Sequence, residues 1–68
     1  MDREQLFNGI MRELPRVRSL ALRHGDNGGA GKFQEQRILL DIKASEDAIW
    51  DNDVVAMAKA YMDLKEVR

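Results

Sequence analysis

The feature that most constrains this chain is its small size without covalent or metal support: 68 residues with no cysteine and a single histidine. A chain of this length buries only about 60% of the surface that its unfolded form exposes, so its core is marginal. Small domains usually compensate with disulfides, a structural metal or a partner chain, and the composition excludes the first two. That leaves oligomerisation or unusually good packing, and we expect one helical domain over residues 1–68 with a homodimer as the preferred state.

The residue types favour helix over strand. Threonine is absent, β-branched residues are sparse, and Leu, Ala, Met, Glu, Gln, Lys and Arg dominate outside a central glycine-rich stretch. These are the stronger helix formers, whereas strands prefer β-branched and aromatic side chains. The composition predicts an all-α fold, a small bundle of three or four helices.

The first segment has the apolar spacing of an amphipathic helix. Steps of four, four, three and four residues separate the members of one face, which are Leu6, Ile10, Leu14, Val17 and Ala21. This spacing predicts a helix over residues 2–24. Pro15 removes one backbone hydrogen bond, so the helix kinks there or a second helix begins there. Further apolar residues widen the face beyond what one core needs, and this suggests contact with a second molecule: Phe7, Met11 and Leu22.

The middle of the chain combines a predicted loop with an ambiguous segment. Residues 25–31 hold four of the five glycines, which predicts a loop at about residues 25–32. In residues 33–44, apolar residues alternate as in a strand until Leu39 interrupts them, whereas the other residue types favour helix. We prefer helix and leave strand open. Ser45, followed by two acidic residues, is typical of a helix start and predicts a break near that position.

The C-terminal segment is predicted to be helical over residues 53–67. It has one broad apolar face, formed by Val54, Met57, Ala58, Tyr61, Met62 and Leu64. A face of this width again suggests that part of it meets another molecule.

The sequence predicts no catalytic, cofactor-binding or metal-binding residues. Gly31 and Lys32 resemble the end of a phosphate-binding loop, but Asp26 and Phe33 occupy positions where that loop needs glycine and Ser or Thr. His24 has no cysteine or second histidine with which to complete a transition-metal site. The acidic residues around Trp50 lack a calcium-loop pattern and are interpreted as caps and solvated groups. The chain is therefore not expected to be an enzyme.

The leading functional hypothesis is a small regulator or inhibitor that binds another protein and dimerises through its apolar helix faces. Residues 1–34 carry six basic and four acidic side chains and residues 35–68 carry five and eight, so the two halves have net charges of +2 and −3. This asymmetry suits antiparallel self-association, or simply the packing of helices of opposite sign within one molecule. The candidate partner or dimer contacts are Phe7, Met11, Trp50, Met57, Tyr61 and Leu64.

The alternative is a compact, dimeric DNA-binding transcriptional regulator. An ideal first helix places three arginines on one stripe that could contact phosphates, namely Arg12, Arg16 and Arg23. A net charge of −1 makes nucleic acid the weaker expectation. No apolar run approaches the roughly 20 residues of a membrane span, and the N-terminal residues lack a signal-peptide pattern, so a cytoplasmic location is expected.

Overall fold

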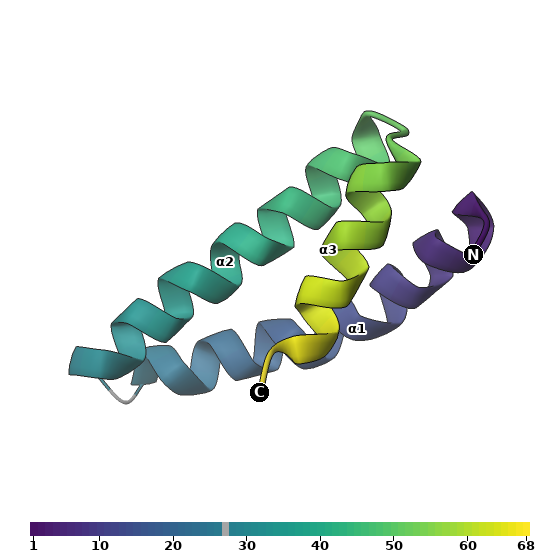
Figure 1. Ribbon diagram of the computed structural model, residues 1–68. Helices are drawn as coiled ribbons and strands as arrows, with labels where there is room; N and C mark the ends of the chain where they lie inside the picture. The colour runs from purple at the N-terminus through teal and green to yellow at the C-terminus, as the bar shows by residue number, and fades with distance from the viewer. Residues whose placement is uncertain (27) are drawn as a thin grey trace.

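The computed structural model describes residues 1–26 and 28–68 and contains three packed helices (Figure 1). They are α1 (Arg3–Asp26), α2 (Gly29–Trp50) and α3 (Val54–Glu66). The all-α class is confirmed, and residues 33–44 are helical rather than extended. The number of helices is three, so a fourth helix is not found within the described residues.

Helix α1 begins close to the predicted start and continues without interruption through Pro15. Pro15 is exposed, so its ring and its missing N–H lie on the outer side of the helix. In Figure 1, α1 changes direction near its middle, as expected where one backbone hydrogen bond is absent. No second helix begins at Pro15.

The glycine-rich connection is much shorter than predicted. Gly25 belongs to the last turn of α1, and Gly29 and Gly31 belong to the first turn of α2. Asn27, which lies inside the predicted loop, falls outside the described residues. Gly28 has φ 65° and ψ −167°, a backbone conformation that residues other than glycine rarely adopt. Its carbonyl accepts a hydrogen bond from the Gly31 N–H at 2.7 Å. The chain reverses in so few residues because glycine can adopt this conformation.

The predicted helix break at Ser45 is wrong, because α2 passes through this residue without interruption. Ser45 is fully buried, and its hydroxyl donates a hydrogen bond to the Ile42 carbonyl at 2.7 Å. The hydroxyl is thus satisfied within the helix instead of capping a new one. Its small size also suits a position inside the core.

The real break lies between Trp50 and Val54. The Asn52 N–H bonds to the Ile49 carbonyl at 3.1 Å and the Asp53 N–H bonds to the Ala48 carbonyl at 3.0 Å, while Asn52 has φ 55°. This is a Schellman ending of α2, with asparagine in the left-handed position. The Asp53 side chain then accepts from the Ala56 N–H at 3.1 Å and caps α3.

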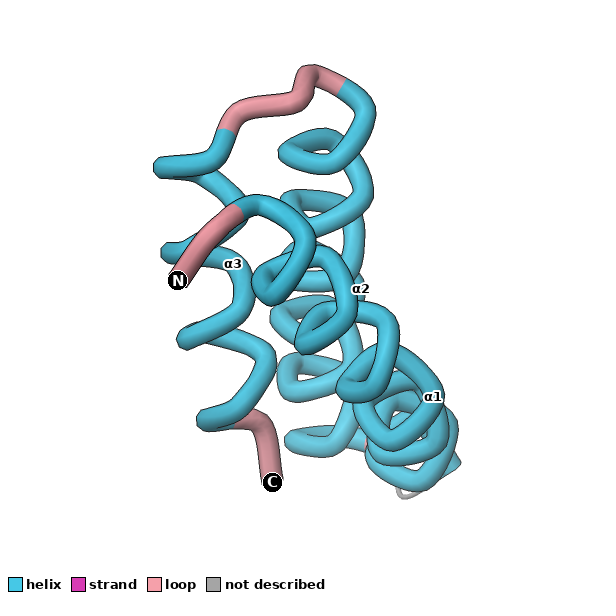
Figure 2. The backbone as a smooth tube through the Cα atoms, turned by 90° about the vertical axis from the view of Figure 1, so that its right-hand side faces the viewer, coloured by secondary structure: helices cyan, strands magenta, loops and turns pink. Residues whose placement is uncertain are grey.

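The core runs along the middle of the bundle, where each helix contacts the other two (Figure 2). The four most completely buried apolar side chains come from two helices, Ile10 and Val17 from α1 and Met57 and Leu64 from α3. Helix α2 adds Ile38, Ile42 and Ala48. The molecule measures 38 × 17 × 16 Å. Among the helices in the described part of the chain, none combines the length and apolar character needed to cross a membrane.

Candidate protein-binding surface

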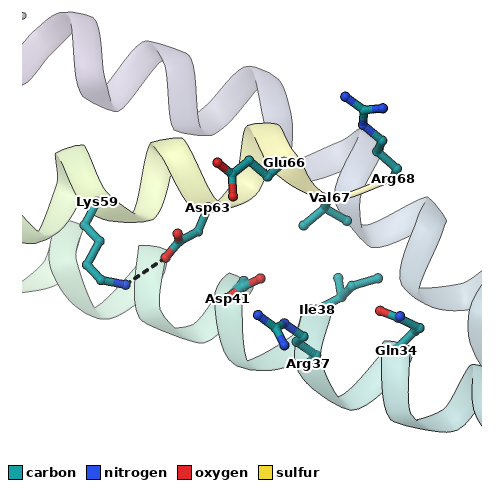
Figure 3. Close-up of a pocket in the computed structure, with 9 residues that line it drawn as sticks. All are labelled: Gln34, Arg37, Ile38, Asp41, Lys59, Asp63, Glu66, Val67 and Arg68. Carbon is teal, nitrogen blue, oxygen red and sulfur yellow. Dashed lines mark hydrogen bonds and ion pairs between the residues drawn. The ribbon is translucent and has the colours of Figure 1, made fainter.

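Helices α2 and α3 border a cleft of about 490 Å³ with charged walls (Figure 3). Three acidic side chains face it, Asp41, Asp63 and Glu66, together with Arg37, Lys59 and Arg68. Lys59 and Asp63 form an ion pair at 3.0 Å. In the described ranges, no group of three or more acidic or histidine side chains is placed to hold a metal ion. The cleft therefore offers mixed, partly neutralised charge.

Asp41 is the titratable group that this cleft perturbs. Partial burial raises the pKa of its carboxyl above the ordinary value, and the nearby Asp63 carboxylate raises the pKa further. Arg37 and Lys59 act in the opposite direction without cancelling the effect. Asp41 is thus a mildly unfavourable charge at neutral pH.

A different surface, on the side of α1 and α2 away from α3, carries large apolar side chains. Arg18 of α1 and Glu46 of α2 form an ion pair at 3.7 Å across the seam between these helices. On α1, Met11 and Leu22 project within about 40° of Arg18, because they lie seven residues before it and four after it. On α2, Leu39 and Trp50 have the same spacings from Glu46. We call these six residues the α1/α2 face.

The α1/α2 face is highly exposed. Trp50 is 89% exposed and Leu22 70%, while Leu39 and Met11 are 45% and 47% exposed. Gly9 and Arg16 of α1 contact α3, and both lie on roughly the opposite side of α1 from Arg18. The face is therefore open on the side that α3 leaves uncovered. A hollow lined by Met1, Gln5, Asn8, Met11 and Arg12 extends it along the outside of α1.

The six predicted partner contacts divide into three groups. Met57 and Leu64 are fully buried in the core of the monomer, so their assignment to a partner surface is corrected. They are covered because the broad apolar face of α3 packs between α1 and α2. Tyr61 is half-buried on the side of α3 that contacts α1, with the Lys65 ammonium 5.2 Å from its ring.

The remaining three predicted contacts lie on the α1/α2 side of the molecule. Met11 and Trp50 belong to the α1/α2 face itself. Phe7 precedes Met11 by one helical turn, is half-buried against the core, and has the Arg3 guanidinium 6.0 Å from its ring. The structure thus gathers half of the predicted set on one side.

The predicted phosphate contacts are not equivalent. The Arg16 guanidinium donates to the Leu64 carbonyl at 2.9 Å and to the Val67 carbonyl at 2.7 Å, and it pairs with Glu13 at 2.9 Å. Arg16 therefore ties α1 to the C-terminal end of α3 rather than forming part of an open basic stripe. Arg12 and Arg23 are exposed.

His24 and the acidic residues near Trp50 have structural roles. His24 lies in the last turn of α1, with its Nε2 3.1 Å from the Arg68 carbonyl oxygen. Asp53 caps α3, and Asp47 pairs with Lys43 at 3.0 Å. None of these groups needs a ligand to explain its position.

Four members of the α1/α2 face are not among the candidate partner contacts chosen from the sequence: Leu22, Leu39, Arg18 and Glu46. The spacing of residues 39, 46 and 50 repeats that of residues 11, 18 and 22, but the repeat has meaning only once α1 and α2 are known to be antiparallel neighbours. No family model, curated protein or solved structure matches this chain. The shape and chemistry of the surface therefore carry the functional interpretation.

Proposed function

We propose that this chain is a small, non-enzymatic protein-binding regulator or inhibitor that acts as a homodimer through apolar helix faces. The observation that carries the proposal is the α1/α2 face, where Trp50 is 89% exposed and Leu22 70% exposed beside two further large apolar side chains. Clustered apolar side chains with charged neighbours are typical of protein interaction sites. Tryptophan is also among the residues that most often dominate binding energy.

The small core supports self-association as part of this function. Among the residues that the structure describes, eleven apolar ones are buried, and three of these are alanines, which contribute little volume. A partner that covers further apolar surface would stabilise so small a domain, because association shifts the folding equilibrium toward the native state. A dimer would still leave apolar side chains of other helix faces, such as Phe33 and Val55, for a second protein.

The solution mass of the chain tests this proposal. Light scattering after size-exclusion chromatography, repeated over a dilution series, should give a mass of about twice 7.8 kDa at high concentration. A mass of 7.8 kDa at every concentration would contradict the homodimer.

DNA binding remains the second candidate, and the position of Arg16 makes it the weaker one. A guanidinium that holds the end of α3 is less able to contact phosphate, and two exposed arginines give a small electrostatic footprint. Titration with duplex DNA at low salt tests this candidate. Binding that weakens steeply with added salt would favour it, and absence of binding would remove it.

A further inference from the structure

The α1/α2 face has an internal symmetry that suggests its occupant. Each helix contributes one charged residue flanked by two large apolar ones, Met11 and Leu22 around Arg18, and Leu39 and Trp50 around Glu46. The two triplets run in opposite directions, because α1 and α2 are antiparallel. Leu22 and Leu39 thus lie toward the α1–α2 connection, while Met11 and Trp50 lie toward the other end.

We propose that the α1/α2 face binds a second copy of this chain, with the two-fold axis parallel to the helices, so that α1 of each copy packs on α2 of the other. This inference rests on the proposed homodimer and adds its site and orientation. The dimer would have a central four-helix bundle, formed by α1 and α2 of both copies, in which neighbouring helices run antiparallel. One α3 would pack on each outer side of this bundle.

Charge favours a second copy in this orientation. Helix α1 carries five arginines against three acidic residues, a net charge of +2, and α2 carries three basic and four acidic residues, a net charge of −1. Packing α1 on α2 of the partner brings opposite charges together. An axis perpendicular to the helices would pack α1 on α1 and place like charges opposite one another.

A two-fold axis parallel to the helices also leaves each residue of the second copy at the same height along the bundle as the same residue of the first copy. Arg18 then faces Glu46 of the partner subunit, and the Arg18–Glu46 pair of one copy joins that of the other in a network of four charges. On one side of this network, Leu22 meets Leu39 of the partner subunit, and on the other side Met11 meets Trp50 of the partner subunit. Apolar contacts on both sides would shield the charges from water and strengthen their interaction.

The available area suits a dimer. The long faces of the molecule measure about 38 × 17 Å. A specific interface buries roughly 800 Å² on each partner, which a face of these dimensions can approach once side-chain relief is included.

Charge insertion on the α1/α2 face tests the site. Leu22→Asp and Leu39→Asp should each convert the dimer to a 7.8 kDa species at concentrations where the wild type is dimeric, because each buries an unpaired carboxylate in the interface. Both positions are substantially exposed in the monomer, so the helical circular dichroism should be retained. Met62→Asp is the matched control, since Met62 is 57% exposed on α3 and lies outside the interface.

Reversal of the central charges is the second test, which changes no apolar contact. Arg18→Glu alone should raise the dimer dissociation constant at least about tenfold, because four carboxylates would then meet at the centre. Combining it with Glu46→Arg should restore most of the affinity. A double variant that binds no better than the single one would overturn the charge network.

Cysteine cross-linking tests the orientation, because the chain has no cysteine of its own. An equimolar mixture of Leu22→Cys and Leu39→Cys, oxidised with glutathione disulfide, should form a covalent dimer. Either variant alone should not. A covalent dimer from Leu22→Cys alone, or no covalent dimer from the mixture, would overturn the parallel axis.

The failures of the two proposals can be told apart. A wild-type chain that stays monomeric rejects the homodimer and with it this interface. A wild-type dimer that survives Leu22→Asp and Leu39→Asp, or that dissociates equally with Met62→Asp, rejects only the α1/α2 face as its site.

Discussion

Gly9 makes room on α1 for the ring of Tyr61. A Cβ at this position would lie 2.8 Å from two ring carbons of Tyr61, closer than side chains tolerate. We expect Gly9→Ala to lower the free energy of unfolding by about 1–3 kcal/mol, because the overpacking outweighs the roughly 1 kcal/mol by which alanine favours a helix. Urea denaturation checks the value. Asn8→Ala, at an exposed position on the same helix, is the control and should be neutral or slightly stabilising.

Asp41 should make stability depend on pH in an unusual direction for a carboxylate. Burial and the Asp63 charge raise its pKa in the folded protein, so the native state binds this proton more tightly than the unfolded state. The contribution of Asp41 to stability therefore falls as pH rises from its ordinary pKa through the raised one. Asp41→Asn should raise the melting temperature at pH 7.

The same variant should lose its advantage at low pH, where the carboxyl of the wild type is itself neutral. Melting temperatures at pH 7 and pH 3 measure the difference. Asp47→Asn is the matched control, because it removes an exposed ion pair with Lys43 on the same helix and should bring no gain at pH 7. Equal melting temperatures for Asp41→Asn and wild type at pH 7 would show that Arg37 and Lys59 fully compensate the charge.

At the scale of elements, Arg16 holds the end of α3 against α1. Its guanidinium bonds to the carbonyls of Leu64 and Val67 at the C-terminal end of α3, where the Leu64 carbonyl also accepts from the Val67 N–H at 3.2 Å. Arg16→Ala should lower the free energy of unfolding by about 1–2 kcal/mol, whereas an exposed surface arginine would contribute much less. Thermal denaturation of both variants checks this. Arg12→Ala is the control, and its free energy of unfolding should lie within about 0.5 kcal/mol of the wild-type value. Equal effects of the two substitutions would mean that the bonds to α3 add nothing.

The extents of α1 and α3 were predictable because their apolar spacing is regular and their ends agree with local signals. The aspartate at position 53 caps α3 as its type suggests. The two errors in α2 share a physical cause. Glycine and serine have weak helix preference, but tertiary packing decides their state when a helix is long and one face is buried. Gly29 and Gly31 belong to the first turn of α2, which follows directly on the positive-φ residue Gly28, and Ser45 fits because its hydroxyl finds a carbonyl within its own turn.

At the scale of the whole molecule, stability should depend on protein concentration. If the native state is a dimer, dilution favours the unfolded chains, so the melting temperature should fall when wild type is diluted a hundredfold. Scanning calorimetry or fluorescence from Trp50 can follow this. The same dilution should leave the melting temperature of Leu22→Asp unchanged, and a wild-type melting temperature independent of concentration would contradict the dimer.

The binding surface was less predictable than the helices because it is defined by what the third helix covers. From the sequence, Met57, Leu64, Met11 and Trp50 are alike candidate partner contacts. Only the packing of α3 across α1 and α2 separates the first two, which are fully buried, from Trp50, which is almost fully exposed. Periodicity indicates which way a side chain points, but the neighbouring helix decides whether anything lies there.

The order of the helices also has a consequence for the order of folding. A connection of two residues joins α1 to α2, whereas the hydrogen bonds from α1 to residues 52–68, in α3 and at its two ends, join residues 44 to 51 positions apart in the chain. The α1–α2 hairpin can thus close before α3 docks on it, because contacts between nearer residues form faster. Until then, Ile10 and Val17 have no α3 to cover them. During this interval, other unfolded chains or chaperones meet an apolar surface that α3 covers in the folded protein.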